Sequence, residues 1–382
     1  MPRVLHVSTV HPPYDTRIFQ REARGLAERG YCVEVAINVR EPTARNGIKV
    51  HALGDGSGPR SRRIIRNARA LRHMLDGFDI VHVHDPELLI AGSIARLFGR
   101  RVVYDIHEYY YKQLSEKKEG RSWIPPFLRR GVALAYRTIE QFALPRFAGI
   151  VVISPEMAAM YESLVPPDRI AIVRNYPQIS AQNVAAARAD PPPLAGPYVV
   201  QTGGATYMRC FDILVETIEL MREAGNSTPL VVLGGTNLSG YDLQRRAELI
   251  ERARHANIVV LDRLPYAEML RWVAHAAVGI ATYRRTSNAE LGFSTKVFEY
   301  FAFGIPTVVS DFGNSAKIVL NHGAGAAVPW NDSQEYARAV RRYLEDPAER
   351  ARAAASASAA ARNYLFETEL TNLVALYERI LA

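Results

Sequence analysis

Cysteine is scarce in this chain of 382 residues: only Cys32 and Cys210 occur, one in each half. Two thiols so far apart in the sequence indicate neither a disulfide framework nor a thiolate metal site. No apolar run reaches about 18 residues, which excludes an ordinary transmembrane helix. The chain opens on Pro2-Arg3 and then Val4–Val7, which is typical of a first strand and not of a signal peptide. We therefore expect a cytoplasmic protein.

Several functional motifs are also missing. No Gly-x-Gly-x-x-Gly follows the first strand of either half, which counts against a dehydrogenase. Neither His-x-x-x-His nor Asp-x-Asp occurs, and the one His-x-His, at His82 and His84, has only Asp85 beside it. We therefore expect no bound metal and no cofactor. The net charge of +8 favours anionic partners, but no basic stripe with interleaved aromatic residues points to nucleic acid.

The first half alternates short apolar strands with helical patterns. This alternation predicts an α/β fold with a parallel sheet covered on both faces. The expected strands are Val4–Ser8, Cys32–Ile37, Asp79–His84, Arg101–Asp105 and Gly149–Ile153. The expected helices run over residues 17–29, 61–75, 87–97 and 127–142.

The pattern lapses between Asn175 and Pro197, where three consecutive prolines, Pro191–Pro193, predict a linker. It then restarts, and residues 335–382 are mostly helical and rich in alanine and arginine. The expected strands of this half are Tyr198–Thr202, Leu230–Leu233, Ile258–Leu261, Val278–Thr282 and Thr307–Ser310. We predict two Rossmann-like domains, residues 1–180 and 198–365, joined by a linker at 181–197 and facing each other across a cleft.

The segment from Glu290 to Pro306 is the most informative part of the chain. Ser294 and Thr295 stand where a helix should begin, and Lys296 and Glu299 then project from nearly the same face. Exposed amides at a helix N-terminus and a nearby ammonium suit a diphosphate, whereas a carboxylate one turn deeper suits neutral hydroxyls such as those of ribose. The pattern indicates a nucleotide-sugar site. The alternative is an exposed pair of charges on a helix surface.

A second candidate for the same site follows the first strand of this half. Gly203 and Gly204 allow a ligand to approach the backbone closely, and Arg209 comes just before the next helix. A guanidinium can hold a diphosphate through two hydrogen bonds. The alternative is that the two glycines only form a turn.

In the first half, polar residues follow the strands. Asp15 and Arg17 suit either contact with an acceptor or a role in capping the next helix. His107 and Glu108 follow a strand at the expected lip of the cleft, so we expect His107 to contact substrate. His82 and His84 share one face of a strand. Each has either a functional role or only a structural one, as a hydrogen-bonded histidine at the end of a strand.

Two basic amphipathic segments lie in the first half. In the first, the apolar residues Ile64, Ile65, Ala68, Leu71 and Leu75 are surrounded by arginines at positions 62, 63, 66, 69 and 72. In the second, Trp123, Phe127 and Leu128 precede Arg129 and Arg130. Either segment suits peripheral contact with an anionic membrane, at its inner face, or else a solvated helix face over the core.

Short motifs along nearly the whole chain resemble those of retaining glycosyltransferases of the GT-B fold, in particular the large family four of nucleotide-sugar-dependent transferases. They occur in the family's order, and the last is the most specific. They are His-Pro-Pro-Tyr-Asp-Thr-Arg at 11–17, His-Val-His-Asp at 82–85, Asp-Ile-His-Glu at 105–108, Val-Ile-Ser-Pro-Glu at 152–156, Arg-Asn-Tyr-Pro at 174–177, Gly-Gly at 203–204 with Arg209, and Thr-Lys-Val-Phe-Glu-Tyr-Phe-Ala-Phe-Gly-Ile-Pro at 295–306.

The resemblance implies roles for the second half. Arg209 and Lys296 would hold the donor diphosphate, helped by the amides around Ser294 and Thr295, and Glu299 would bind the ribose hydroxyls. The turn that borders the base would consist of Asp262, Arg263 and Leu264.

For the first half, the resemblance implies that His107 reaches the sugar or the acceptor hydroxyl. The first-half loops, with Asp15, Arg17 and Glu108, would shape the acceptor site. The final helix, at about residues 366–382, would cross back to the first domain.

Two departures from the family pattern concern the donor site. Many members carry two glutamates eight positions apart, but eight positions before Glu299 stands Leu291, and Glu290 is one residue out of register. Cys210 occupies the position after the phosphate-binding arginine, where glycine is usual.

The resemblance implies metal-independent transfer of a sugar from a UDP- or GDP-sugar to a sugar, lipid-linked or small-molecule acceptor, with retention of configuration. The product would belong to a cell-surface polysaccharide, a glycolipid or a secondary metabolite. No nucleophilic carboxylate is evident, so we expect front-side attack. The alternatives are a nucleotide-sugar epimerase of the same fold and a catalytically degenerate scaffold.

Overall fold

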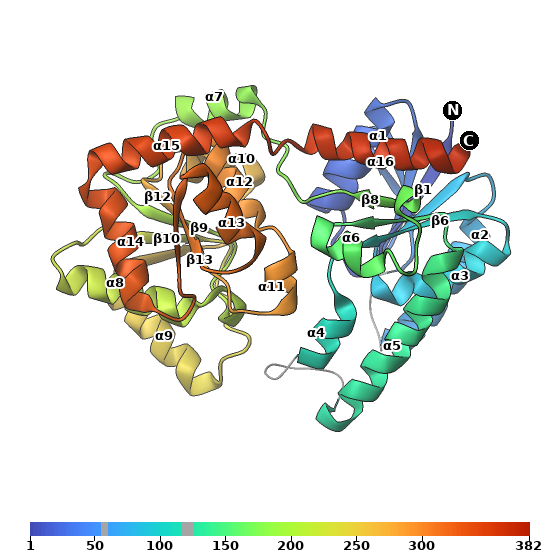
Figure 1. The fold of residues 1–382 in the computed structure, drawn as a ribbon, viewed down its shortest axis with the longest axis horizontal. Helices are drawn as coiled ribbons and strands as arrows, with labels where there is room; N and C mark the ends of the chain where they lie inside the picture. The colour runs from blue at the N-terminus through green and yellow to red at the C-terminus, as the bar shows by residue number, and fades with distance from the viewer. Residues whose placement is uncertain (55–59, 117–124) are drawn as a thin grey trace. The chain divides into compact units, whose positions relative to one another are not determined.

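Two units, each built on its own sheet, make up the chain (Figure 1). The structure, a computed structural model, describes residues 1–54, 60–116 and 125–382. Among these, unit 1 contains Met1–Glu116, the stretch that ends at Asn175, and Phe366–Ala382, whereas unit 2 contains Tyr176–Leu365. The last helix of the chain therefore belongs to unit 1.

Eight strands of the described residues form the sheet of unit 1, in the order β3-β4-β2-β1-β5-β6-β7-β8. Neighbours are parallel except for the pair β3 and β4. The strand order reverses between β1 and β5, and open α/β sheets bind ligands at the carboxyl ends of strands at such a reversal. The strands are β1 (Arg3–Val7), β2 (Cys32–Ile37), β3 (Thr43–Arg45), β4 (Ile48–Ala52), β5 (Ile80–Val83), β6 (Arg101–Ile106), β7 (Gly149–Val152) and β8 (Ile170–Ile172).

Helices cover both faces of this sheet. Leu5 and Val7 pack on the side of α2, α3, α5 and α6, whereas Val4 packs on the side of η1, α1 and α16, because successive strand residues face opposite ways. These helices are η1 (Thr16–Ala23), α1 (Arg24–Glu28), α2 (Arg60–Met74), α3 (Leu89–Leu97), α4 (Tyr110–Glu116), α5 (Arg129–Ala143), α6 (Pro155–Tyr161) and α16 (Phe366–Leu381). Short 3₁₀ turns are η2 (Pro86–Leu88), η3 (Pro126–Leu128), η4 (Leu144–Arg146) and η5 (Pro167–Arg169).

Helix α16 is held to unit 1 by an apolar face of helical spacing. Its buried residues Leu370, Leu373 and Leu376 pack on the sheet, and burial of each such side chain stabilises by about 1.5–3 kcal/mol. The Glu369 carboxylate pairs with Arg174 at 3.0 Å. Figure 1 shows α16 beside α1, and the two helices are in contact.

Six strands of the described residues form the sheet of unit 2, all parallel, in the order β11-β10-β9-β12-β13-β14. The order reverses between β9 and β12. The strands are β9 (Val199–Thr202), β10 (Leu230–Leu233), β11 (Ile258–Leu261), β12 (Val278–Ala281), β13 (Thr307–Ser310) and β14 (Gly325–Val328).

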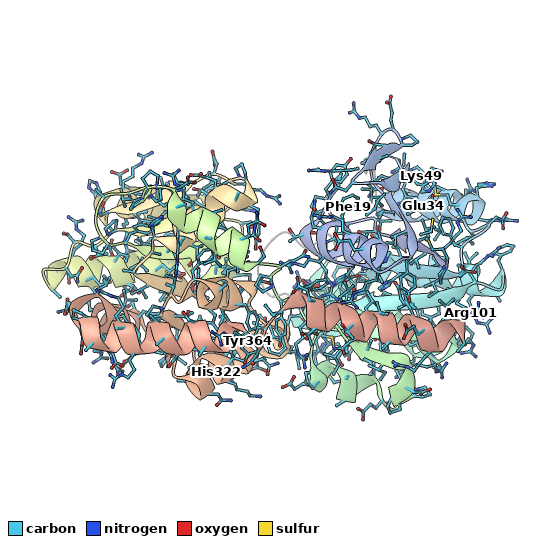
Figure 2. All side chains as sticks on the ribbon, turned by 90° about the horizontal axis from the view of Figure 1, so that it is seen from above. Phe19, Glu34, Lys49, Arg101, His322 and Tyr364 are labelled. Atoms are coloured by element: carbon cyan, nitrogen blue, oxygen red, sulfur yellow. The ribbon has the colours of Figure 1, made fainter. Side chains whose placement is uncertain are left out.

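The helices of unit 2 again cover both faces. Residues of α8, α9 and α14 form one core with the sheet, and residues of α7, α10, α12, α13 and α15 form the other. Figure 2 shows His322 and Tyr364 side by side in the second layer, where the imidazole and the phenol share a 2.7 Å hydrogen bond. The helices are α7 (Ala181–Ala189), η6 (Tyr207–Arg209), α8 (Phe211–Glu223), α9 (Leu243–His255), α10 (Tyr266–Ala274), α11 (Ser287–Leu291), α12 (Thr295–Ala302), α13 (Gly313–His322), α14 (Ser333–Glu345) and α15 (Pro347–Ala361).

The expected linker differs from the structure, because α7 occupies the first half of residues 181–197 and packs against α10 of unit 2. Ser180 and Asn183 form a capping box at its start, and Ala187 is buried. The sequence pattern missed this helix because alanines on both sides of it give no apolar stripe. Strands β3, β4, β8 and β14 were also missed. Strands β3, β8 and β14 have only three or four residues, whereas β4 carries an alternating pattern, Ile48-Lys49-Val50, that could have identified it.

Glu140 of α5 is buried at 4 % exposure and accepts hydrogen bonds from Tyr136 and Tyr161 at 3.2 and 3.1 Å. Burial raises the pKa of Glu140 to about 7. Because the pKa in the folded state exceeds the ordinary value, the carboxyl group stabilises the fold at low pH and loses this contribution as pH rises through about 7.

We therefore expect Glu140→Gln to gain stability relative to the wild type by about 2–3 kcal/mol between pH 5 and pH 8. Urea unfolding at the two pH values measures this difference. The exposed Glu162→Gln is the matched control. An equal pH response of wild type and Glu140→Gln would contradict the prediction.

Candidate active site

In unit 2, the carboxyl ends of β9 and β12 bring the predicted donor residues together. The chain leaves β9 through Gly203 and Gly204, and it leaves β12 through Thr282 and Tyr283. The Thr282 hydroxyl donates to the carbonyl oxygen of Arg209 at 2.6 Å, which ties the two strand ends to η6. This is the place where the strand order reverses and where a doubly wound sheet binds its ligand.

The backbone at Gly204 is packed too closely for a side chain. A Cβ atom there would lie 2.6 Å from the carbonyl oxygens of both Gly234 and Gly235. Gly203 has a φ of +83°, which favours glycine for a separate reason. Two glycine pairs, after β9 and after β10, therefore meet backbone to backbone. The sequence reasoning missed the second pair, although it follows a strand just as the first pair does.

Arg209 ends η6, whose first turn is capped by the hydroxyl of Thr206. Its Nη1 donates to the carbonyl oxygen of Gly204 at 3.2 Å. The guanidinium lies over Gly203, where an added Cβ would come within 2.8 Å of Cζ. Arg209 is thus held at the strand edge, as a diphosphate-binding residue requires.

Cys210 follows with φ 50° and ψ 45°, the left-handed conformation that glycine adopts without strain. A side chain in this conformation costs about 1–2 kcal/mol. The cysteine is fully buried, and burial raises the pKa of its thiol to about 12, so the thiol stays neutral. The backbone at Cys210 therefore has the left-handed conformation that is typical of glycine, although the residue is a cysteine.

Lys296 lies in the first turn of α12. Its Nζ donates to the hydroxyl of Tyr283 at 2.6 Å and lies 5.0 Å from the centre of that ring. Ser294, the residue before α12, is 9 % exposed, and among the described residues its hydroxyl has no hydrogen-bond partner. A cation and a helix N-terminus with a spare hydroxyl therefore face the same edge as Arg209.

Tyr283 is a residue of this edge that the sequence reasoning missed. Burial by itself raises the pKa of Tyr283. The positive charges of Lys296 and Arg209 have the larger combined effect and lower the pKa to about 7. A phenolate in this position competes with a bound diphosphate for Lys296. The only sequence signal for it was its place directly after the end of a strand.

Glu299 is 7 % exposed and accepts from the hydroxyl of Thr202 at 3.3 Å, so it reaches the end of β9 from one turn inside α12. Glu290 instead pairs with Arg285 at 2.6 Å on the outside of α11. The shift of one residue noted in the sequence thus corresponds to a surface ion pair. Thr295, the first residue of α12, lies between Ser294 and Lys296.

The turn formed by Asp262, Arg263 and Leu264 follows β11. The carboxylate of Asp262 lies 3.3 Å from where a Cβ of Gly235 would stand. Because Gly235 touches Gly204, this turn is connected to the donor edge through the two glycine pairs.

In unit 1, His107 follows β6 and is partly exposed. Its ring stacks on that of His84 with centroids 5.5 Å apart, and its Nε2 lies 3.8 Å from Asp105. Burial lowers the pKa of His107 to about 3, more than the nearby Asp105 raises it. The imidazole is therefore neutral at physiological pH. Glu108, beside it, is exposed and accepts from Gln113 at 2.6 Å.

Asp15 caps η1, because its carboxylate accepts from the backbone nitrogens of Arg17 and Ile18 at 2.8 and 3.1 Å. It also lies 3.8 Å from the imidazole of His11. The capping alternative is thus realised for Asp15.

Arg17 differs from the expectation that it faces an acceptor. The guanidinium is 6 % exposed and binds Asp105 through two nitrogens, at 3.0–3.2 Å. It also contacts Glu22 at 3.0 Å and the carbonyl oxygen of Val173 at 2.9 Å. A buried guanidinium needs these partners because an unpaired charge in the core is costly, and they leave it pointing inward.

His6, His82 and His84 lie on the same face of β1 and β5, beneath η1 and α16. His6 and His82 are partners in the strand register, and all three are fully buried. Burial lowers the pKa of His6 and of His82 well below the ordinary value. The sequence placed His82 and His84 together but had no signal for His6 and Glu22, which the fold brings beside them.

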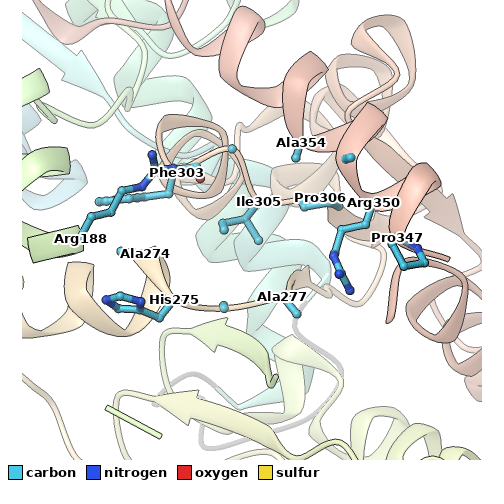
Figure 3. A pocket seen from close by; sticks show the side chains of 13 residues that line it. Arg188, Ala274, His275, Ala277, Phe303, Ile305, Pro306, Pro347, Arg350 and Ala354 are labelled. Carbon is cyan, nitrogen blue, oxygen red and sulfur yellow. Dashed lines mark hydrogen bonds between the residues drawn. The ribbon is translucent and has the colours of Figure 1, made fainter. Parts of the chain in front are cut away.

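A hollow of about 580 Å³ opens at the other edge of the unit 2 sheet, at the amino ends of β12 and β13 (Figure 3). Arg188 and His275 lie at one end and Arg350 at the other. Each of these bases already donates to, or shares a hydrogen bond with, a backbone carbonyl, of Phe303, Asp190 and Tyr343 respectively. Because it lies at the amino ends of the strands, the hollow is separate from the donor edge, which lies at their carboxyl ends.

Two doubly wound α/β units, one carrying a cationic edge at its strand reversal, have the architecture of the GT-B class. Residues 16–176 match the model of the glycosyl transferase 4-like domain, and residues 196–346 match that of the glycosyl transferases group 1. The chain belongs to this glycosyltransferase family, and the expected GT-B fold is confirmed.

Curated relatives are distant. The D-inositol 3-phosphate glycosyltransferase of Jonesia denitrificans is 26% identical over 191 residues, which are 48% of this chain and 43% of that protein. The glycogen synthase of Mycobacterium tuberculosis is 26% identical over 288 residues, 72% of this chain and 63% of that protein. The chain thus spans about half to two thirds of these relatives.

Solved structures of similar fold match almost from end to end. Sucrose-phosphate synthase from Thermosynechococcus elongatus has a TM-score of 0.77 at 15% identity, with 99% of both chains covered. Anabaena HepE in complex with UDP-glucose has a TM-score of 0.71 at 14% identity, again with 99% of both chains covered. Because these identities are low, the likeness shows only that the chain shares the fold of these proteins.

If a diphosphate binds at this edge, we expect its affinity to depend on pH through Tyr283. A bound diphosphate favours the protonated phenol, so binding takes up a proton, and affinity falls as pH rises through about 7, the pKa of Tyr283. We expect a nucleotide-sugar, whose diphosphate does not titrate in this range, to bind roughly ten-fold more weakly at pH 8.5 than at pH 6. Calorimetry at the two pH values measures this change.

Tyr283→Phe should bind equally at both pH values, since it removes the titrating group and leaves the ring. Tyr266→Phe, an exposed tyrosine of the same unit, is the control and should keep the wild-type dependence. A pH response that persists in Tyr283→Phe would contradict the assignment.

Proposed function

We propose that the protein transfers a sugar from a UDP- or GDP-sugar to an acceptor hydroxyl, with retention of the anomeric configuration. The observation that carries this proposal is the donor edge of unit 2, where Arg209, Lys296 and Glu299 converge on the ends of β9 and β12. The acceptor is a sugar, a lipid-linked sugar or a small molecule. The reaction serves the synthesis of a cell-surface polysaccharide, a glycolipid or a secondary metabolite.

Arg209 and Lys296 stabilise the leaving diphosphate. Two fixed cations and the amides at the start of α12 offset the charge that develops as the glycosidic bond breaks, so the diphosphate needs no metal ion. Glu299 accepts hydrogen bonds from the ribose hydroxyls, because a carboxylate beside the diphosphate would repel it but suits neutral hydroxyls. The support for these roles is the contact of each side chain with the same strand ends.

Transfer proceeds by front-side attack. The acceptor oxygen forms the new bond to the anomeric carbon on the face that the diphosphate leaves, and the acceptor proton passes to the departing phosphate oxygen. The carboxylates near the donor edge favour this route, since Glu299 is engaged by Thr202 and Glu290 by Arg285. Neither is left to act as a nucleophile.

Unit 1 supplies the acceptor site. His107 is neutral and its side chain is partly exposed, which suits contact with a hydroxyl group. With a pKa near 3 it orients the hydroxyl and does not act as its base. Glu108 and the loop at Asp15 complete the acceptor side.

Arg209→Ala and Lys296→Ala should each raise the barrier to transfer by about 2–4 kcal/mol, because each removes a group that stabilises the leaving charge. Turnover with a panel of UDP- and GDP-sugars and simple acceptors measures the loss. Arg254→Ala, which removes an exposed cation on α9 of the same unit, is the matched control.

Near-normal turnover in both variants would overturn the donor site. Incubation of the donor alone separates transfer from epimerisation, since an epimer formed without acceptor would favour the epimerase. Absence of nucleoside diphosphate binding would favour the scaffold. Turnover that requires added Mg²⁺ or Mn²⁺ would contradict the metal-independent step.

We also propose that α5 rests on an anionic membrane surface. Phe127, Leu134 and Phe142 form an apolar stripe along η3 and α5, exposed at 82, 62 and 62 %. Arginines flank the stripe, and the only acidic residue between positions 127 and 146 is the buried Glu140. Among the described residues no helix is long and apolar enough to cross a membrane, and Trp123 and the side chains of residues 62–64 lie outside the described part.

Replacement of Phe127 and Phe142 by serine should weaken binding to vesicles that contain anionic lipid by at least roughly ten-fold, since each buried phenyl ring contributes about 1.5–3 kcal/mol. Co-sedimentation measures this binding, which should fall with salt. Leu97→Ser, at an 85 % exposed position of α3, is the control. Equal binding to neutral vesicles would contradict a role for the arginines.

A further inference from the structure

A cluster of metal-ligand side chains lies inside unit 1. The histidine cluster consists of His6 on β1, His82 on β5, His84 directly after β5, and Glu22 on η1. All four side chains are buried, and their ligand atoms lie within 4.8 Å of one another. Three imidazoles and one carboxylate are a donor set that zinc accepts.

The separations are close to those of a four-coordinate site. Nδ1 of His6 lies 2.8 Å from Nε2 of His84 and 4.0 Å from Oε2 of Glu22. Ligand atoms about 2.0–2.2 Å from one tetrahedral cation stand about 3.4 Å apart, between these two values. To bind one ion, the longer separations, which reach at most 4.8 Å, would have to shorten and the 2.8 Å separation would have to lengthen.

Several of the ligand atoms lack ordinary partners. Among the described residues, neither carboxylate oxygen of Glu22 makes a hydrogen bond, although Nε of Arg17 is 3.0 Å from one of them. Nε2 of His82 also has no hydrogen-bond partner. Buried polar atoms are normally satisfied, so these atoms point to an additional group in the cluster.

Neighbouring side chains hold the imidazoles as ligands require. Nδ1 of His82 is 2.7 Å from the hydroxyl of Tyr377, which leaves Nε2 facing the cluster. Nδ1 of His84 is 3.3 Å from Asp105. Metal-bound histidines usually engage their second nitrogen with such a partner.

The charges of the cluster also favour a cation. Arg17 is bound by Asp105 through two nitrogens and touches Glu22 only at one oxygen. The two carboxylates thus share one guanidinium. A bound cation would supply a second positive charge beside the buried Glu22.

We propose that the histidine cluster binds one divalent transition-metal ion, for which Zn²⁺ is the best match. The ion joins η1 to β1 and β5 behind His107 and stabilises unit 1. It lies in a different unit from the donor diphosphate and takes no part in its departure. The alternative is a cluster closed by protons and hydrogen bonds alone.

Metal analysis of the whole protein, expressed with zinc in the medium and purified without chelator, tests the proposal independently of any transfer activity. We expect about one zinc per chain in the wild type and a loss of most of it in His82→Gln and in Glu22→Gln. Tyr377→Phe keeps all four ligands and should weaken metal affinity by roughly ten-fold or more. His51→Gln, a histidine of β4 paired with Glu34, should keep its zinc.

If the ligand variants do not fold, wild-type protein refolded with Co²⁺ decides, because a tetrahedral cobalt site gives intense visible absorption and octahedral aqueous cobalt does not. A wild type with less than about a tenth of an equivalent of metal, and no rise in melting temperature when refolded with Zn²⁺ or Co²⁺, overturns the proposal. Zinc that persists at full content in folded His82→Gln also overturns it, because the ion then lies elsewhere.

Discussion

The donor edge depends on one close contact, between Gly204 and the carbonyl oxygens of Gly234 and Gly235. This contact fixes how the chain leaves β9. It therefore positions the carbonyl oxygen of Gly204, to which Arg209 donates. It also positions the nearby hydroxyl of Thr202, which donates to Glu299. Because no side chain fits there, the cations and the carboxylate are placed by backbone geometry and not by their own packing.

The two units treat buried charge in opposite ways. At the edge of unit 2, Arg209 donates to a carbonyl oxygen and Lys296 donates to a phenol. Such an edge is unfinished without an anion. In unit 1, Arg17 is fully engaged by Asp105 and Glu22, so the polar interior there serves the fold and the positioning of His107.

The sequence predicted most of the fold because its central strands are apolar runs between recognisable helices. It also indicated that Gly203, Arg209 and Lys296 share one strand edge, since these residues lie in contiguous motifs. The sequence did not predict the role of a residue where that role depends on partners that are distant in the chain. Tyr283 acquires its character only from Lys296 folding against it, and Arg17 looked available because its partner Asp105 is 88 positions away.

The buried histidines of unit 1 are a second case in which partners distant in the chain decide what a residue can do. His82 and His84 have no ligand-like neighbour in sequence except Asp85, which led to the expectation that no metal binds. Parallel pairing of β1 with β5 sets His6 opposite His82, and η1 then adds Glu22 from above the sheet. Alternating side chains on adjacent parallel strands can assemble a ligand set that no linear motif records. Local spacing therefore indicates which residues share a strand or a helix face in this fold, and it carries no information about groups that separate strands bring together.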